Sequence, residues 1–252
     1  MNKQESIAFV WHKIVDEVAV VIKDEPMLAN FLQTTVLDHS NMGESLGFHL
    51  ASKLSSKAIP LATLLPLFNE IFASDQVLYA ASRDIQATVD RDSACSVYST
   101  PFLYFKGFLA LQAYRVTHQL WNRGNQSLAL MLQHSISTHF AVDIHPAAKI
   151  GSGILIDHAT GLVIGETAVV EDSVSIMQSV TLGGTGKESG DRHPKIRKNV
   201  LLGPGAKVLG NIEVAEGSMV AASSVVLKSV PAHSIIAGVP AEVVGKADVD
   251  KP

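Results

Sequence analysis

The chain has 252 residues, 47% of them hydrophobic, which is enough for a globular protein of one large or two modest domains. Its 20 Lys and Arg and 24 Asp and Glu are interspersed, and the formal net charge of −4 argues against a nucleic-acid-binding protein, which usually carries a concentrated basic face. A single cysteine, Cys95, excludes an intramolecular disulfide framework and fits a reducing cytoplasm. No activating pattern surrounds it, so we expect an ordinary thiol in a loop.

Residues 1–140 are predicted to form a helical domain that contributes to oligomerisation and to part of the functional site. Apolar residues from Ile7 to Ile22 recur at three- and four-residue spacing and predict an amphipathic helix. A long helix is expected over residues 101–123, closed by Gly124, and another over 126–139. Four aromatic residues lie at helical spacing in the first of these and are expected to serve packing: Phe102, Tyr104, Phe105 and Phe108.

Neither a secretion signal nor a membrane span is expected. The first residues show no basic cluster followed by an apolar run. The most apolar helical stretch, residues 101–121, contains Lys106, Arg115 and His118.

A six-residue rhythm dominates residues 141–242. Neither a helix, with a period of 3.6, nor a strand, with a period of 2, produces such a rhythm, whereas hexapeptide repeats form a parallel β-helix. We therefore predict an α+β fold, with the helical domain followed by about four β-helical coils and by a short frayed tail, residues 243–252. The aliphatic markers are Ile144, Ile150, Ile156, Ile164, Val170, Ile176, Leu182, Ile196, Leu202, Val208, Val214, Val220 and Val226.

The rhythm is interrupted twice, and the interruptions are the candidate functional regions. Two extra residues follow Asp157 and His158. The loop 183–195 then leaves the coil in a Gly-rich polar excursion that contains Asp191, Arg192 and His193. Insertions on a rigid repeat scaffold commonly carry function.

Several motifs resemble the bacterial serine O-acetyltransferase family over nearly the whole chain. They are the segments 98–101 (YSTP), 106–115 (KGFLALQAYR), 143–151 (DIHPAAKIG), 157–161 (DHATG), 180–187 (VTLGGTGK) and 191–196 (DRHPKI). The resemblance implies a left-handed parallel β-helix, trimers paired into a homohexamer, and transfer of acetyl from acetyl-CoA to L-serine in cysteine biosynthesis. It also implies inhibition by L-cysteine at the serine site.

Such a transfer needs a proton acceptor for the serine hydroxyl, and an imidazole is the usual general base. The resemblance makes His158 that base and Asp143 its carboxylate partner. A zwitterionic acceptor also needs a cation for its carboxylate and anions for its ammonium group. By resemblance these are Arg192 for the first and Asp92 and Asp157 for the second, with His193 as a second serine-site histidine.

Acetyl-CoA is expected along the groove between neighbouring coils, as a co-substrate rather than a resident cofactor. The resemblance places Gly184 and Thr185 near the thioester, with Gly203, Ala206 and Ala222 as further contacts. No metal site is expected. Neither a Walker motif nor a dinucleotide fingerprint occurs, which argues against a nucleoside triphosphate.

Three alternatives remain open. A related hexapeptide transferase would act on a sugar or antibiotic hydroxyl. A β-helical zinc enzyme would need three converging histidines, and a non-catalytic scaffold would only bind the next enzyme of the pathway. The tail, residues 247–252, ends in Lys-Pro and lacks the terminal isoleucine that the family inserts into O-acetylserine sulfhydrylase, so we expect weak or absent binding to that partner.

Overall fold

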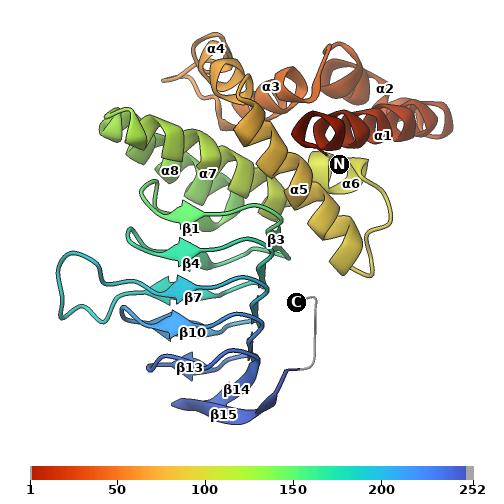
Figure 1. The fold of residues 1–252 in the computed structure, drawn as a ribbon. Helices are drawn as coiled ribbons and strands as arrows, with labels where there is room; N and C mark the ends of the chain where they lie inside the picture. Colours follow the sequence, from red (N-terminus) through yellow and green to blue (C-terminus); the bar gives the residue numbers. More distant parts are fainter. Residues whose placement is uncertain (1, 248–252) are drawn as a thin grey trace.

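A computed structural model describes residues 2–247 and places a helical part on one end of a stack of short strands (Figure 1). The predicted amphipathic stripe is confirmed, because α1 buries Ile7, Ile14 and Val18. No helix within residues 2–247 has the length and apolar character needed to cross a membrane. The helical elements are α1 (Lys3–Asp24), η1 (Pro26–Leu28), α2 (Ala29–Leu32), η2 (Gln33–Leu37), α3 (Met42–Leu54), α4 (Leu61–Phe72), α5 (Asp75–Arg91), α6 (Ser99–Tyr104), α7 (Lys106–Asn122) and α8 (Gln126–Phe140).

The structure differs from the sequence analysis over residues 101–123, where a single helix was expected. The chain breaks at Phe105, which is extended, and α6 and α7 lie on either side of it. A Cβ on Gly107 would lie 2.1 Å from the carbonyl oxygen of Ile156, so the first turn of α7 packs directly on the β-helix. This close approach fixes where α7 must begin, and helix propensity carries no information about it.

The strands form three sheets, one on each side of a prism, and all strand pairs are parallel except the last pair of sheet C. Sheet A contains β1 (Val142–Ile144), β4 (Leu162–Ile164), β7 (Thr181–Gly183), β10 (Lys207–Leu209) and β13 (Val225–Val226). Sheet B contains β2 (Lys149–Ile150), β5 (Val169–Val170), β8 (Lys195–Ile196) and β11 (Glu213–Val214). Sheet C contains β3 (Leu155–Ile156), β6 (Ser175–Ile176), β9 (Leu201–Leu202), β12 (Met219–Val220), β14 (Ser234–Gly238) and β15 (Ala241–Lys246).

The six-residue markers stack into three columns, one per sheet. In sheet A the paired residues include Ile144 with Ile164, Ile164 with Leu182, and Val208 with Val226. Nearly all the markers are buried, so each coil contributes aliphatic side chains to one continuous interior. The predicted parallel β-helix is confirmed.

The number of coils and the C-terminal end differ from the prediction. Sheet A holds five strands where about four coils were expected, because Leu182 begins a coil that the loop 184–194 separates from its continuation at Lys195. Residues 243–246 are not a frayed tail: they belong to β15, which pairs antiparallel with β14. Residues 248–252, on which the expectation about O-acetylserine sulfhydrylase depends, lie outside the described residues.

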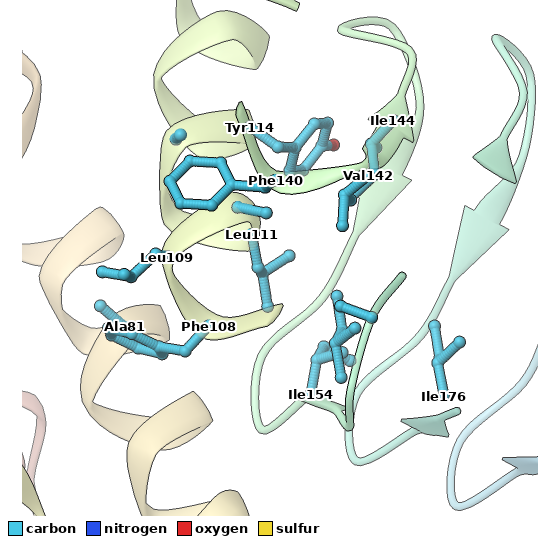
Figure 2. Packing of buried hydrophobic residues seen from close by; sticks show 14 of the residues in the cluster. Ala81, Phe108, Leu109, Leu111, Tyr114, Phe140, Val142, Ile144, Ile154 and Ile176 are labelled. Atoms are coloured by element: carbon cyan, nitrogen blue, oxygen red, sulfur yellow. The ribbon is translucent and has the colours of Figure 1, made fainter. Parts of the chain in front are cut away.

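Helices α7 and α8 close the upper end of the β-helix (Figures 1 and 2). Figure 2 shows Leu111 and Tyr114 of α7 beside Val142 and Ile154 of the first coil. The Tyr114 hydroxyl donates a hydrogen bond to the carbonyl of Ala148. A solenoid needs such a cap, because its terminal coil would otherwise expose the aliphatic interior.

Candidate active site

One part of the predicted site lies where the helical part meets the first coil. A cavity of about 370 Å³ is lined there by Asp92, Asp157 and His158. Asp92 follows the last residue of α5, and the other two residues follow β3. The structure therefore brings Asp92 together with Asp157 and His158, which lie more than sixty positions further along the sequence, and we call this cluster the His158 half-site.

The elements around the His158 half-site are held by specific contacts. Gly107 allows α7 to lie against the carbonyl of Ile156, immediately before Asp157. Arg91, at the end of α5, donates a hydrogen bond of 3.2 Å to the Ser175 hydroxyl of the second coil. Asp92 caps the following turn by accepting the amide of Ala94 at 2.8 Å.

His158 lies in the turn that leads from sheet C into sheet A. Its φ of 53° and the φ of 61° at Ala159 place two consecutive non-glycine residues in the left-handed region, whereas left-handed residues at other corners, such as Ser173 and Ser179, stand singly. The side chain is 72% exposed, and its Nε2 lies 3.5 Å from Oδ2 of Asp157. The imidazole is thus accessible to a ligand in the cavity.

The expected pairing of His158 with Asp143 is not formed within the described residues. Asp143, on β1, instead accepts a hydrogen bond of 2.6 Å from Gln133 of α8. The carboxylate that lies beside the imidazole is Asp157. A role for Asp143 in orienting the base stays a prediction.

Arg192 and His193 lie elsewhere, at the turns that lead from sheet A into sheet B, and we call this cluster the His193 half-site. His193 is 7% exposed, and a Cβ on Gly165 would lie 2.1 Å from its ring, so the imidazole occupies the space that a larger residue at 165 would fill. Burial, followed by the charge of Arg192, lowers the pKa of His193. The ring is therefore neutral at physiological pH.

The Arg192 guanidinium is already paired. It donates to Glu166 Oε2 at 2.7 Å and to the carbonyl of Gly190 at 3.0 Å. The hydrogen bond from Arg192 to Glu166 holds the pKa of Glu166 below its usual range. An incoming carboxylate must therefore share the five guanidinium donors with Glu166.

The two half-sites flank sheet A of the same chain, at different corners of the prism. His158 precedes the first residue of β4, and Gly165, on which His193 packs, follows the last. A single chain therefore does not bring His158 and Arg192 together.

The residues predicted for acetyl-CoA divide between the same two corners. Gly203 and Ala222 lie below His158 in the stack, and Gly184 and Thr185 begin the loop that carries Arg192. Gly203 has a packing reason to be glycine, since its Cβ would lie 2.7 Å from the carbonyl oxygen of Val220. Contacts of these four residues with acetyl-CoA stay predictions.

Ala206 fits a coenzyme contact less well. Its methyl group is fully buried in the coil interior. Its amide donates to Gly203, and its carbonyl accepts from Thr181. The residue is therefore part of the scaffold.

Several residues of the half-sites were not singled out from the sequence. Tyr104, Phe105 and Lys106 line the cavity with Asp92, although the two aromatic residues were expected to serve packing alone. Glu166 and Thr167 contact the Arg192–His193 pair. They occupy an ordinary coil turn, and only the stacking of coils reveals their neighbours.

Neither a reactive Cys95 nor a zinc site is supported by the surroundings of the residues concerned. Burial raises the pKa of the Cys95 thiol, which donates to the carbonyl of Val97, so the thiol is not activated as a nucleophile. Among residues 2–247, no three His, Cys, Asp or Glu side chains converge as a metal-ligand set.

A helical cap on a hexapeptide-repeat β-helix, with titratable residues gathered at its corners, defines a hexapeptide-repeat transferase. The family model described as serine acetyltransferase, N-terminal, matches residues 10–113. The serine acetyltransferase of Escherichia coli K12 is 55% identical over 98% of this chain and 91% of its own length. The chain belongs to the serine acetyltransferase family.

Solved structures agree over the whole fold. Serine acetyltransferase from Vibrio cholerae superposes with a TM-score of 0.95 at 53% identity, covering 97% of this chain and 95% of that one. The enzyme from Brucella abortus, solved in complex with coenzyme A, has a TM-score of 0.93 at 48% identity, covering 94% and 96%. Two further structures with TM-scores of 0.93 are a soybean serine acetyltransferase complexed with serine and a serine acetyltransferase complexed with cysteine.

Proposed function

We propose that this chain transfers an acetyl group from acetyl-CoA to the hydroxyl of L-serine, giving O-acetyl-L-serine and CoA. The observation that carries the proposal is the convergence of Asp92, Asp157 and His158 on one cavity in a chain of this family. The single Cys95 has no disulfide partner, which fits the reducing cytoplasm we propose for the reaction.

His158 acts as the general base. It accepts the proton of the serine hydroxyl while the serine oxygen attacks the thioester carbonyl. The carbon–sulfur bond breaks, the CoA thiolate leaves, and the imidazolium returns the proton to that thiolate. Asp157, 3.5 Å from the ring, stabilises the positive charge that the imidazole carries meanwhile.

Serine is held by both of its charges. Asp92 and Asp157 line the cavity beside the base and provide acceptors for the ammonium group. Arg192 and the neutral His193 provide donors for the carboxylate. L-Cysteine differs from serine only in its side-chain atom, so it occupies the same position and inhibits.

The serine site is composite. The two half-sites lie at the two corners that bound sheet A. When the His158 corner of one chain packs against the His193 corner of a neighbouring chain, the two half-sites meet. This contact joins different corners of the two chains, so it is head-to-tail, and three chains joined in this way form a closed cyclic trimer. The helical parts then pair two trimers into a hexamer.

A thiol-release assay tests the activity. Purified protein is supplied with acetyl-CoA and a panel of hydroxyl acceptors that includes L-serine, D-serine, L-homoserine and an amino sugar. We expect CoA release with L-serine, and competition by L-cysteine against L-serine. Turnover of the sugar in preference to L-serine would contradict the proposal and favour the alternative transferase.

A further inference from the structure

Thr167 lies at the centre of the His193 half-site, in the turn between β4 and β5. Its Oγ1 accepts hydrogen bonds from the backbone amides of Arg192 at 3.0 Å and His193 at 3.1 Å. The same Oγ1 lies 2.8 Å from Nδ1 of His193. One hydroxyl thus contacts both residues that are predicted to hold the carboxylate of the acceptor.

The direction of each hydrogen bond follows from the donors. The backbone amide of Thr167 donates to Nδ1 of His193 at 3.1 Å, so Nδ1 carries no proton. The oxygen of the Thr167 hydroxyl accepts two amide hydrogens, and its own hydrogen is shared between Nδ1 of His193 and the Asp191 carboxylate, with which Thr167 also forms a hydrogen bond. The proton of the neutral imidazole must therefore reside on Nε2.

Nε2 is free to serve a ligand. Within the part of the chain that the structure describes, this nitrogen has no hydrogen-bond partner, whereas Nδ1 accepts the amide hydrogen of Thr167. The ring cannot tilt towards the coil, because it already fills the space above Gly165. Nε2–H is thus a fixed donor at the face of the half-site.

We propose that Thr167 is the positioning residue that makes His193 a neutral Nε2–H donor for the acceptor amino acid and holds Arg192 beside it. The inference rests on the proposed function, because it assigns the acceptor-binding group of that same site. Thr167 acts through its two neighbours and does not touch the substrate. Acetyl-CoA binding does not depend on it.

The test compares Thr167→Val, which keeps the shape and removes the hydroxyl, with Thr167→Ser, which keeps the hydroxyl. We expect Thr167→Val to raise the KM for L-serine and the inhibition constant of L-cysteine by about tenfold, the scale of one or two lost hydrogen bonds. The KM for acetyl-CoA should stay within about twofold, and Thr167→Ser should restore both serine-site constants. Thr138→Val, the same change at an exposed position of α8, is the matched control and should leave all constants unchanged.

A second variant guards against a Thr167→Val protein that does not fold. Gly165→Ala inserts a methyl group where the His193 ring lies but leaves the Thr167 hydroxyl intact. It should produce the same selective loss of serine and cysteine binding. Unchanged serine constants in both variants, or a Thr167→Ser enzyme as impaired as Thr167→Val, would overturn the inference. A wild-type protein without serine acetylation would instead overturn the proposed function, and this inference with it.

Discussion

His158 combines three properties at one residue: a left-handed backbone, a side chain that is 72% exposed, and a place in the wall of the cavity that also contains Asp92. A general base contributes at least about 10²-fold to turnover, so we expect His158→Ala to lower kcat by that factor or more. The KM for serine should change little, because Asp92 and the His193 half-site remain. Steady-state kinetics with both substrates measures the effect.

The control for this variant is His12→Ala, which removes an exposed imidazole from α1, away from the cavity. It should turn over like the wild type. Near-wild-type kcat in His158→Ala would remove the residue from the role of base and leave Asp157 as the group to test next.

At the scale of single elements, α3 docks on α6 through a buried histidine. Nε2 of His49 donates to the carbonyl of Leu103 at 3.1 Å, and the ring stacks on Phe102. Burial lowers the pKa of His49 to about 4, with the charge of Lys53 as the next cause. The unfolded chain therefore binds a proton below pH 6.5 that the folded chain does not bind until about pH 4.

Stability should accordingly fall as the pH drops through this window. Between pH 7.5 and 5.5 the loss attributable to His49 is about 1 kcal/mol, which corresponds to a lower melting temperature by about 2–4 °C. In His49→Gln, which has no imidazole, the loss of unfolding free energy between pH 7.5 and 5.5 should be smaller by that amount. Differential scanning calorimetry of both proteins at the two pH values measures this effect. An equal shift in melting temperature in the wild type and the variant would contradict the role of His49.

Helix α5 is joined to α7 by a buried ion pair, Asp84 with Arg115, and both side chains also form hydrogen bonds with the first coil. Asp84 is fully buried and accepts from Arg115 at 2.6 Å and from the amide of Ile154 at 2.9 Å, while Arg115 also donates to the carbonyl of Gly151 at 2.8 Å. These bonds fix the direction of α5, which carries Asp92 at its end.

Removing one partner leaves a buried charge without compensation, so Asp84→Ala should lower the free energy of unfolding by about 3–5 kcal/mol. The chain supplies a matched control in the pair of Arg123 with Glu70, which has the same 2.6 Å separation but side chains that are 44% and 63% exposed. Glu70→Ala should cost at most about 1 kcal/mol. Urea unfolding of the two variants measures the difference, and similar losses in both would show that burial of the pair is not the cause.

For the whole molecule, the two half-sites lie at different corners of the prism, one on either side of sheet A, and this separation predicts that activity requires assembly of several chains. His158→Ala and His193→Ala should each be nearly inactive alone. When the two are co-expressed, a site is intact wherever an unmodified His158 faces an unmodified His193 of its neighbour, and random mixing makes about one quarter of the sites intact.

Activity of the purified mixture, with light scattering to measure its mass, tests this prediction. We expect a hexamer that regains about one quarter of the wild-type activity. Co-expression of two differently tagged His158→Ala chains is the control and should stay inactive. A mixture no more active than its components, or a monomeric wild type with full activity, would place both half-sites in one chain.

The six-residue rhythm was sufficient to predict the β-helix, because burial of one aliphatic residue per strand is a local requirement that every coil must meet. The Asp157-His158 and Arg192-His193 motifs could also be predicted from the sequence, because they lie where the six-residue rhythm is interrupted. Local patterns also predicted α1 and the end of α7 before Gly124, but not the beginning of α7. The number of coils was underestimated, since Leu182 stands alone before the loop and its partner in the column, Val208, lies far along the chain.

Tertiary structure alone decided which residues meet. The break at Phe105 depends on the approach of Gly107 to Ile156, and the places of Glu166 and Thr167 depend on the loop 184–194 folding back over an earlier coil. Asp143 is turned towards Gln133 by the docking of α8. Sequence by itself determined the repeating unit and the chemistry it carries, whereas stacking and docking decided the neighbours, because contacts between distant segments leave no periodic signal in the chain.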